Sequence, residues 1–325
     1  MGMNGAFFAR RKGLVATAVA IAASAGVAAA AIPASATESH TGKETTILAA
    51  SLRGANEVPV EGGPAVGDKA GAALEFIELK GDKVSVAVAW RGTGRPTELH
   101  IHQGAKGTNG GVRIDFGKLL DKAPEGRYGK APKGRHSLTG TVTVNDPALL
   151  KKLTEDPGSF YANLHTAKFP GGAVRGQLHK VTTTTDFRHV LGSFQASVVK
   201  GRQIYECKAA EGGGYAFGQR DVDARLGGHI RHSFVKPNSG TPQWIAPDGS
   251  AVTGALITKT PNGDGNIPEL DLRATRSGKH HGLLAGTGEI LRLNTVGGLA
   301  PAGSCTPGEI VGVPYQADYV FVRTH

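Results

Sequence analysis

The run ELHIHQG at residues 98–104 carries two histidines, His100 and His102, in an apolar and β-prone context. On a β-strand, this spacing points both side chains to the same face of the sheet. A second strand-like run, YANLHT at residues 161–166, carries a third histidine, His165. If the two strands face each other, the three imidazoles converge. His100, His102 and His165 are therefore candidate metal ligands.

Short alternating apolar and polar runs recur along the chain, which contains 48 glycines in 325 residues. Such runs separated by turn residues are typical of β-strands, so we expect an all-β protein. Between residues 45 and 180 the pattern predicts an antiparallel Greek-key β-sandwich. Its expected strands are 47–52, 71–79, 83–90, 98–103, 112–116, 138–145, 160–166 and 173–180.

Two turns and one helix punctuate this first domain. The turns TNGG (108–111) and PGG (170–172) are expected to close hairpins, because Asn and Gly tolerate the positive φ that hairpin turns need. The segment DPALLKKL (146–153) is the one convincing helix. Asp146 is its expected N-cap and Pro147 its first residue.

Three motifs of this domain resemble those of the chordin-type CHRD domain and occur in the same order. They are LRGANEVP (52–59), HIHQG with GTNG (100–104, 107–110), and YANLHT with PGGAVRGQL (161–166, 170–178). The resemblance covers nearly the whole domain. It implies an extracytoplasmic domain, found in an animal growth-factor antagonist and in many exported bacterial proteins, but it implies no particular activity.

A polar run within residues 181–190 is the expected linker to a second β-rich domain, a sandwich or a barrel, at residues 191–325. This part resembles the exported family called domain of unknown function 3455. The resemblance lies in the order and spacing of four landmarks, and it implies no mechanism. The landmarks are IYEC (204–207), WIAPDGSAV (244–252), RLNTVGG (292–298) and VPYQADY (313–319).

Cys207 and Cys305 are the only cysteines of the chain, and both lie in the second domain. In an exported protein a disulfide is the default expectation for such a pair. The alternative is a pair of redox-active thiols. No Cys-x-x-Cys arrangement supports that alternative.

The N-terminus predicts a signal peptide at residues 1–36. A basic segment RRK (10–12) precedes a run of small apolar residues, and ASA (34–36) supplies a cleavage site. An uncleaved anchor helix is the disfavoured alternative, because the run is mostly Ala, Val and Gly. The pattern favours the Sec route over twin-arginine export. We therefore expect a secreted bacterial protein without a transmembrane segment in its mature chain.

The chain has a formal net charge of +10. Basic residues gather at 118–136, which indicates either a solvated loop or a contact with an anionic cell-envelope polymer. Another extracellular protein is the alternative partner. Nucleic acid is not expected, since export and the lack of aromatic-basic interleaving both argue against it.

The histidine pattern also resembles, in loose outline, that of copper–zinc superoxide dismutase, in which a His-x-His strand and a later histidine bind copper. Arg175 would match its anion-steering arginine. That enzyme also needs a histidine bridging to zinc, further zinc ligands and a disulfide. Between His102 and His165 this chain has only His136, and the first domain has no cysteine. Dismutase chemistry is therefore not expected, and a mononuclear site for copper, with zinc second, stays open.

The competing interpretation is that the histidines serve the fold by bonding backbone groups. The sequence then favours an exported, non-catalytic binding or envelope-associated protein, with copper or zinc binding in metal handling or oxidant defence as the alternative. No catalytic residue is predicted. A hydrolase site in the second domain, using Asp248, Asp271 or Asp318, is a weaker third hypothesis.

Overall fold

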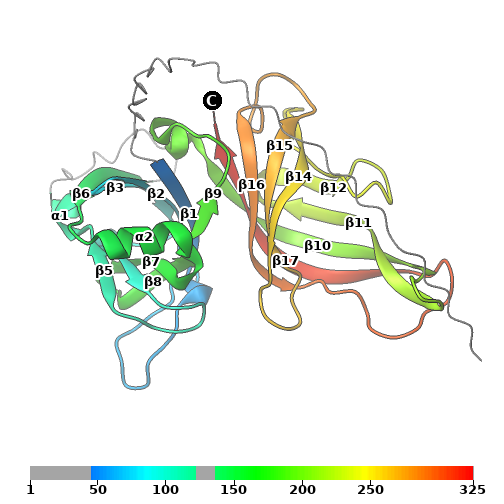
Figure 1. The fold of residues 1–325 in the computed structure, drawn as a ribbon, viewed down its shortest axis with the longest axis horizontal. Helices are drawn as coiled ribbons and strands as arrows, with labels where there is room; N and C mark the ends of the chain where they lie inside the picture. The colour runs from blue at the N-terminus through cyan, green and yellow to red at the C-terminus, as the bar shows by residue number, and fades with distance from the viewer. Residues whose placement is uncertain (1–44, 122–135, 325) are drawn as a thin grey trace, which may run out of the picture. The chain divides into compact units, whose positions relative to one another are not determined.

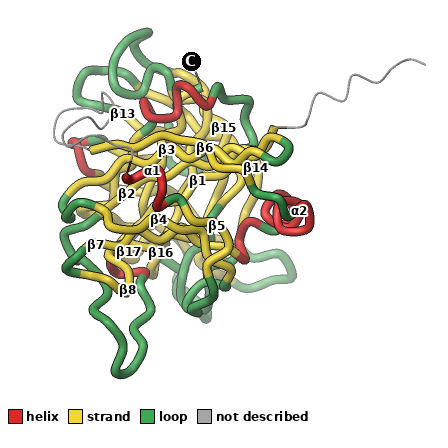
Figure 2. Tube along the Cα trace, turned by 90° about the vertical axis from the view of Figure 1, so that its left-hand side faces the viewer, coloured by secondary structure: helices red, strands yellow, loops and turns green. Residues whose placement is uncertain are grey.

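The computed structural model describes residues 45–121 and 136–324, and β-strands dominate both segments (Figures 1 and 2). The predicted signal peptide, and most of the basic run at 118–136, lie outside the described residues. Within the described residues, no helix is long and apolar enough to cross a membrane. The expectation of an all-β protein with two β-rich domains is confirmed. The predicted boundaries at 45–180, 181–190 and 191–325 stay a prediction.

The first domain is a curled antiparallel sheet with strand order β5-β4-β7-β8-β1-β2-β3-β6, and β9 also pairs with β1 (Figure 1). The strands are β1 (Thr45–Arg53), β2 (Ala72–Lys80), β3 (Lys83–Arg91), β4 (Pro96–Gln103), β5 (Val112–Asp115), β6 (His136–Thr143), β7 (Phe160–Thr166), β8 (Phe169–Gln177) and β9 (His179–Val181). The eight predicted strands therefore form, with the last one split into β8 and β9.

The core of this domain lies inside the curl. Along β1, Leu48, Ala50 and Leu52 enter a cluster of buried side chains drawn from both halves of the sheet. The alternate residues Ile47 and Ala49 belong to another cluster, which continues into the second domain. Both faces of β1 are thus apolar, as expected for a strand covered on both sides.

The predicted helix is confirmed as α2 (Pro147–Glu155), where the Asp146 side chain accepts a hydrogen bond from the Leu149 amide. Four 3₁₀-helices and one short α-helix complete the described helices. They are η1 (Gly54–Asn56), α1 (Gly117–Asp121), η2 (Pro157–Ser159), η3 (Phe187–Gly192) and η4 (Gly227–His229).

The predicted hairpin turn at residues 170–172 is wrong. The chain turns earlier, between Thr166 and Phe169, which pair with each other, and residues 170–172 continue in β8. Gly172 has a φ of 131° and forms a bridge with Val66. A Cβ on Gly172 would lie within 2.6 Å of a Glu57 carboxylate oxygen. Gly171 and Gly172 therefore do not form a turn; they allow the segments that contain Glu57 and Val66 to pack closely against β8.

The second domain is a closed barrel in which strands β10 to β17 pair in sequence order. This decides between the two predicted architectures, sandwich and barrel. The strands are β10 (Phe194–Ala209), β11 (Tyr215–Leu226), β12 (Arg231–Phe234), β13 (Pro242–Ile245), β14 (Ala251–Thr260), β15 (Glu269–Arg276), β16 (Thr287–Gly297) and β17 (Ile310–Arg323). β10 closes the barrel by pairing with β17.

The predicted disulfide between Cys207 and Cys305 is present. It ties the end of β10 to the loop between β16 and β17. No free cysteine remains. The redox-active thiol pair is therefore not what the structure contains.

Candidate metal site

The three predicted histidines meet on one face of the curled sheet. His100 and His102 lie on β4 and His165 on β7, and the two strands pair antiparallel with Glu98 opposite His165. Directly opposed residues point to the same face, so this register places all three imidazoles together. One ligand nitrogen of each histidine lies within 4.8 Å of those of the other two. The sequence-based convergence is thus realised in the fold.

Two of the imidazoles are oriented by backbone carbonyls. His102 Nδ1 lies 2.9 Å from the Gly110 oxygen, and His165 Nδ1 lies 3.0 Å from the Pro170 oxygen. A carbonyl oxygen only accepts, so each Nδ1 carries the proton and donates it. The Nε2 atom of each ring then keeps a free lone pair. This is the arrangement by which metal-binding histidines are commonly held.

His100 is oriented differently. Its Nε2 lies 3.5 Å from an Asp115 carboxylate oxygen, and its Nδ1 lies 3.9 Å from Glu98 Oε2. Its side chain is 12% exposed, so the site is reached from solvent beside this residue. Glu98 and Asp115 are themselves exposed and supply negative charge at the rim.

Three imidazole nitrogens in this group are buried and have no hydrogen-bond partner among the described residues: His100 Nδ1, His102 Nε2 and His165 Nε2. A buried polar atom without a partner normally costs free energy, and most native ones are satisfied. Here each of the three neighbouring rings has one such atom, and each is able to donate a lone pair. This donor set fits a copper or zinc ion, for which imidazole nitrogen is a suitable ligand.

The surroundings favour the neutral form of His100 and His102. Burial is the main cause that lowers the pKa of His100 and His102, and the neighbouring histidines lower it further. For His100, Asp115 and Glu98 oppose this shift; for His102, the bond to Gly110 opposes it. The neutral form is the one that can bind a metal ion.

A stack of side chains supports the loop that carries Gly110. The ring of Tyr161 stacks on His102 with centroids 4.9 Å apart, and the Arg175 guanidinium lies 3.4 Å from the Tyr161 centroid. Arg175 donates to the oxygens of Asn109, Ala105 and Thr108 in the same loop. Arg175 is 1% exposed. Arg175 therefore positions the loop. The dismutase resemblance implied that it steers anions, but a side chain this buried is not available for that role.

The other sequence candidates lie elsewhere. His136 stacks on Trp90 in the first domain, with ring centroids 5.8 Å apart. Asp318 accepts hydrogen bonds from Arg53, Ser51, Ser197 and Asn294. Asp248 accepts from the Leu283 amide and from Ser250.

Asp271 accepts a hydrogen bond from the Thr182 hydroxyl and lies beside Glu289. Burial and this neighbour raise the pKa of Asp271 to about 7. The three aspartates are therefore held by three different sets of partners. They do not form one site, and the hydrolase hypothesis gains no support from them.

Sequence reasoning missed the two carbonyls that orient His102 and His165. Gly110 and Pro170 belong to the turn motifs of the sequence, but nothing in their identity signals which side chain their oxygens accept from. It also missed a cavity inside the barrel, described below.

Comparisons with known proteins agree with this division of the chain. The family model of the CHRD domain matches residues 48–178, and that of the protein family of unknown function DUF3455 matches residues 223–323. No curated protein and no solved structure matches the chain. The chain therefore contains a match to the CHRD domain followed by a match to the DUF3455 family.

Proposed function

We propose that this is an exported, non-catalytic metal-binding protein whose CHRD domain holds one copper ion, with zinc as the second choice, through His100, His102 and His165. The observation that carries the proposal is the convergence of three histidines, each of which has one buried ring nitrogen without a hydrogen-bond partner among the described residues. A role of these histidines in the fold alone would need partners for both ring nitrogens of each buried imidazole. The carbonyl bonds of His102 and His165 account for only one nitrogen each.

Copper is placed first for two reasons. At a site of nitrogen ligands, copper(II) binds more tightly than the other divalent metals of the first transition row. The site also contains no thiolate, because both cysteines of the chain are joined in the barrel. Metal handling or oxidant defence outside the cytoplasm is the biological context that this proposal implies.

We propose a non-catalytic role because the residues around the three histidines do not provide the second metal site that dismutase chemistry needs. A second metal would require further ligands, and the one other histidine between His102 and His165 in the sequence, His136, stacks on Trp90 instead. Envelope association through the basic run stays a prediction, since most of that run lies outside the described residues.

Metal content of the untagged mature protein tests the proposal. The protein is loaded with excess copper or zinc, freed of loose metal on a desalting column, and measured by inductively coupled plasma mass spectrometry. We expect one equivalent of copper in the wild type and a loss of at least tenfold in His102→Ala. His281→Ala changes an exposed histidine of the barrel and is the matched control.

Two results would contradict the proposal. One is a wild-type protein that retains less than a tenth of an equivalent of either metal. The other is equal retention by His102→Ala and His281→Ala, which would place the metal elsewhere. Circular dichroism of each variant establishes that a loss of metal is not a loss of fold.

A further inference from the structure

The barrel of the second domain contains a cavity of about 700 Å³. Residues from all eight strands line it, so the cavity is the lumen of the barrel and not a groove on its outside. One lining residue from each strand, in order from β10 to β17, is Gln203, Val222, His232, Trp244, Thr253, Leu272, Arg292 and Tyr319. Eight-stranded barrels are wide enough to hold one small ligand, and this volume lies in the range of small-molecule sites.

The lumen opens at one end of the barrel. Gly240 and Thr241, Ile267 and Pro268, and Leu299 and Ala300 also line the cavity. They lie in the loops after β12, β14 and β16, which fall at the same end of a barrel whose strands alternate in direction. The disulfide anchors the last of these loops to β10. The mouth is thus covalently braced.

Apolar surface in the cavity is left open to solvent. Leu256 is 59% exposed and Leu299 is 44% exposed, and both line the cavity. Large aliphatic side chains are seldom left accessible in a concave site without a ligand to cover them. Phe234, Leu270 and other apolar side chains extend this surface deeper into the lumen.

Two buried donors in the lining lack an acceptor. The indole Nε1 of Trp244 and the amide Nε2 of Gln203 have no hydrogen-bond partner among the described residues. The two side chains are 0% and 1% exposed. The Gln203 oxygen already accepts from Gln219, so its amide nitrogen is the group left over. Both unpaired groups are N–H donors, so the unpaired polar atoms of the lining present no acceptor that would repel an anion.

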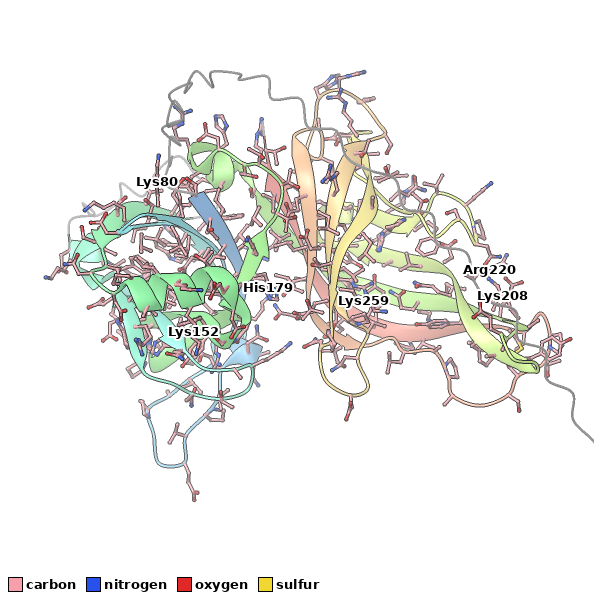
Figure 3. The ribbon with its side chains drawn as sticks, in the orientation of Figure 1. Lys80, Lys152, His179, Lys208, Arg220 and Lys259 are labelled. Carbon is pink, nitrogen blue, oxygen red and sulfur yellow. A yellow bond between two sulfur atoms is a disulfide. The ribbon has the colours of Figure 1, made fainter. Side chains whose placement is uncertain are left out.

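The charges of the lining have one sign. Arg292 lies in the lumen and the exposed Lys259, labelled in Figure 3, contributes to the lining from β14; the cavity lining contains no Asp or Glu. Arg292 donates to the Pro268 oxygen, and no carboxylate among the described residues lies within ion-pair distance of it. A half-buried guanidinium without a counter-ion attracts an anion, and it binds carboxylates well.

We propose that the lumen of the barrel binds an amphiphilic organic anion, a molecule with an apolar body and one carboxylate, whose acidic group is held by Arg292. The apolar body covers the exposed leucines. This site lies in the second domain and does not depend on metal binding by the histidines of the first.

Two fluorescent probes of nearly the same shape test the charge requirement. 8-Anilinonaphthalene-1-sulfonate carries one acidic group, and N-phenyl-1-naphthylamine is the same skeleton without it. We expect saturable binding of the anionic probe to the full mature protein with one site per chain. In Arg292→Met its dissociation constant should rise about tenfold or more, because a charged hydrogen bond is lost, while the neutral probe changes less than twofold.

Two further variants serve as controls. Arg292→Lys keeps the cation and should restore anionic-probe binding to within about threefold of wild type. Arg273→Met removes an exposed arginine that does not line the cavity and should leave both probes unchanged. Unchanged binding of the neutral probe to Arg292→Met shows that the lumen of that variant is intact.

Competition then identifies the body of the ligand. Displacement of the anionic probe by decanoate assigns an alkyl chain, and displacement by 2-naphthoate alone assigns an aromatic body. The proposal is overturned if the wild type gives no saturable site, if neither carboxylate displaces the probe, or if Arg292→Met weakens both probes equally.

Discussion

The histidine cluster of the first domain and the lumen of the second both contain buried polar atoms without partners, but the atoms are of opposite kinds. In the cluster they are three imidazole nitrogens with free lone pairs. In the lumen they are N–H donors, accompanied by an arginine without a counter-ion. Lone pairs suit a cation and donors suit an anion. The chemical type of the unpaired atoms thus distinguishes the two proposed binding sites of this chain.

A histidine of the barrel shows what a buried imidazole does when it is alone. His232 Nδ1 lies 2.9 Å from the Gln243 oxygen, as in the cluster, but the ring stacks on Trp244 with centroids 4.4 Å apart. Its neighbours in the ring contacts are Trp244 and Tyr319, and no second histidine is among them. A bond to a backbone carbonyl therefore does not by itself indicate a metal ligand; the proposed metal site rests on the meeting of three imidazoles.

The chain offers a reporter for each region. It has two tryptophans, Trp90 in the core of the first domain and Trp244 in the barrel. Single-tryptophan variants therefore follow the unfolding of each domain separately. These two reporters show whether a change in one region affects the other.

Removing the disulfide should affect the barrel most. Cys207 and Cys305 are 98 residues apart, and on the chain-entropy model closing such a loop stabilises the folded state by about 4–5 kcal/mol. We expect the paired substitution Cys207→Ala and Cys305→Ala to lower the denaturation midpoint reported by Trp244. Copper retention by the histidines should stay within twofold of wild type. A simultaneous loss of copper would mean that the two regions are not independent.

Glu75 should make the first domain less stable as the pH rises. Its carboxyl is fully buried between apolar strands without a partner, and burial raises its pKa from 4.5 to about 8. The unfolded chain releases this proton above about pH 4.5 while the folded chain keeps it, so stability falls between pH 4.5 and pH 8.

The variant Glu75→Gln has no titrating group at this position, so the stability of its first domain should change less between pH 4.5 and pH 8. At pH 8 it should stabilise the domain by up to about 4 kcal/mol, measured by urea unfolding of Trp90. Glu61→Gln, at an exposed position, is the control and should change stability by less than about 0.5 kcal/mol. An equal pH slope in wild type and Glu75→Gln would refute the assignment.

Copper should stabilise the first domain and leave the barrel unchanged. When the free copper concentration is about 100 times the dissociation constant, one bound ion raises the free energy of unfolding by about 2.7 kcal/mol. The Trp90 transition should shift accordingly in wild type and stay in place in His102→Ala. Burial lowers the pKa of His100 and His102, so protons compete for these nitrogens only at low pH. The pH at which half of the copper is released should therefore lie below 6.5, the ordinary pKa of histidine. Release of half the copper above pH 6.5 would contradict neutral, ligand-ready imidazoles.

His232 should give the barrel the opposite pH dependence from that of Glu75. Burial lowers its pKa from 6.5 to about 3, so between these values the unfolded chain binds a proton that the folded barrel does not. Stability therefore falls as the pH drops below 6.5, by on the order of 2 kcal/mol at pH 5. His232→Phe keeps a ring against Trp244 and should remove this loss. A persistent acid slope of the Trp244 transition in the variant would point to another group.

Local sequence patterns predicted the elements of the first domain closely. Seven of the eight expected strands form within about two residues, and the eighth begins four residues early and is split into β8 and β9. The agreement is close because the alternation of apolar and polar side chains is a property of neighbouring residues. The capping of α2 by Asp146 is local in the same sense. The PGG turn failed because a glycine needed for close approach to another segment looks the same in sequence as a glycine in a turn.

The candidate metal site divides along the same line. The shared face of His100 and His102 follows from their spacing alone, since side chains of a strand alternate. His165 lies beside the other two histidines because β4 pairs with β7. The Nε2 lone pairs of His102 and His165 are left unpaired because the carbonyls of Gly110 and Pro170 accept from Nδ1. In the barrel, closure required β10 to meet β17 more than a hundred residues later. The order of residues along each strand is enough to set which face it buries. Which strands become neighbours follows only from the folded chain, because that choice depends on contacts between residues far apart in the sequence.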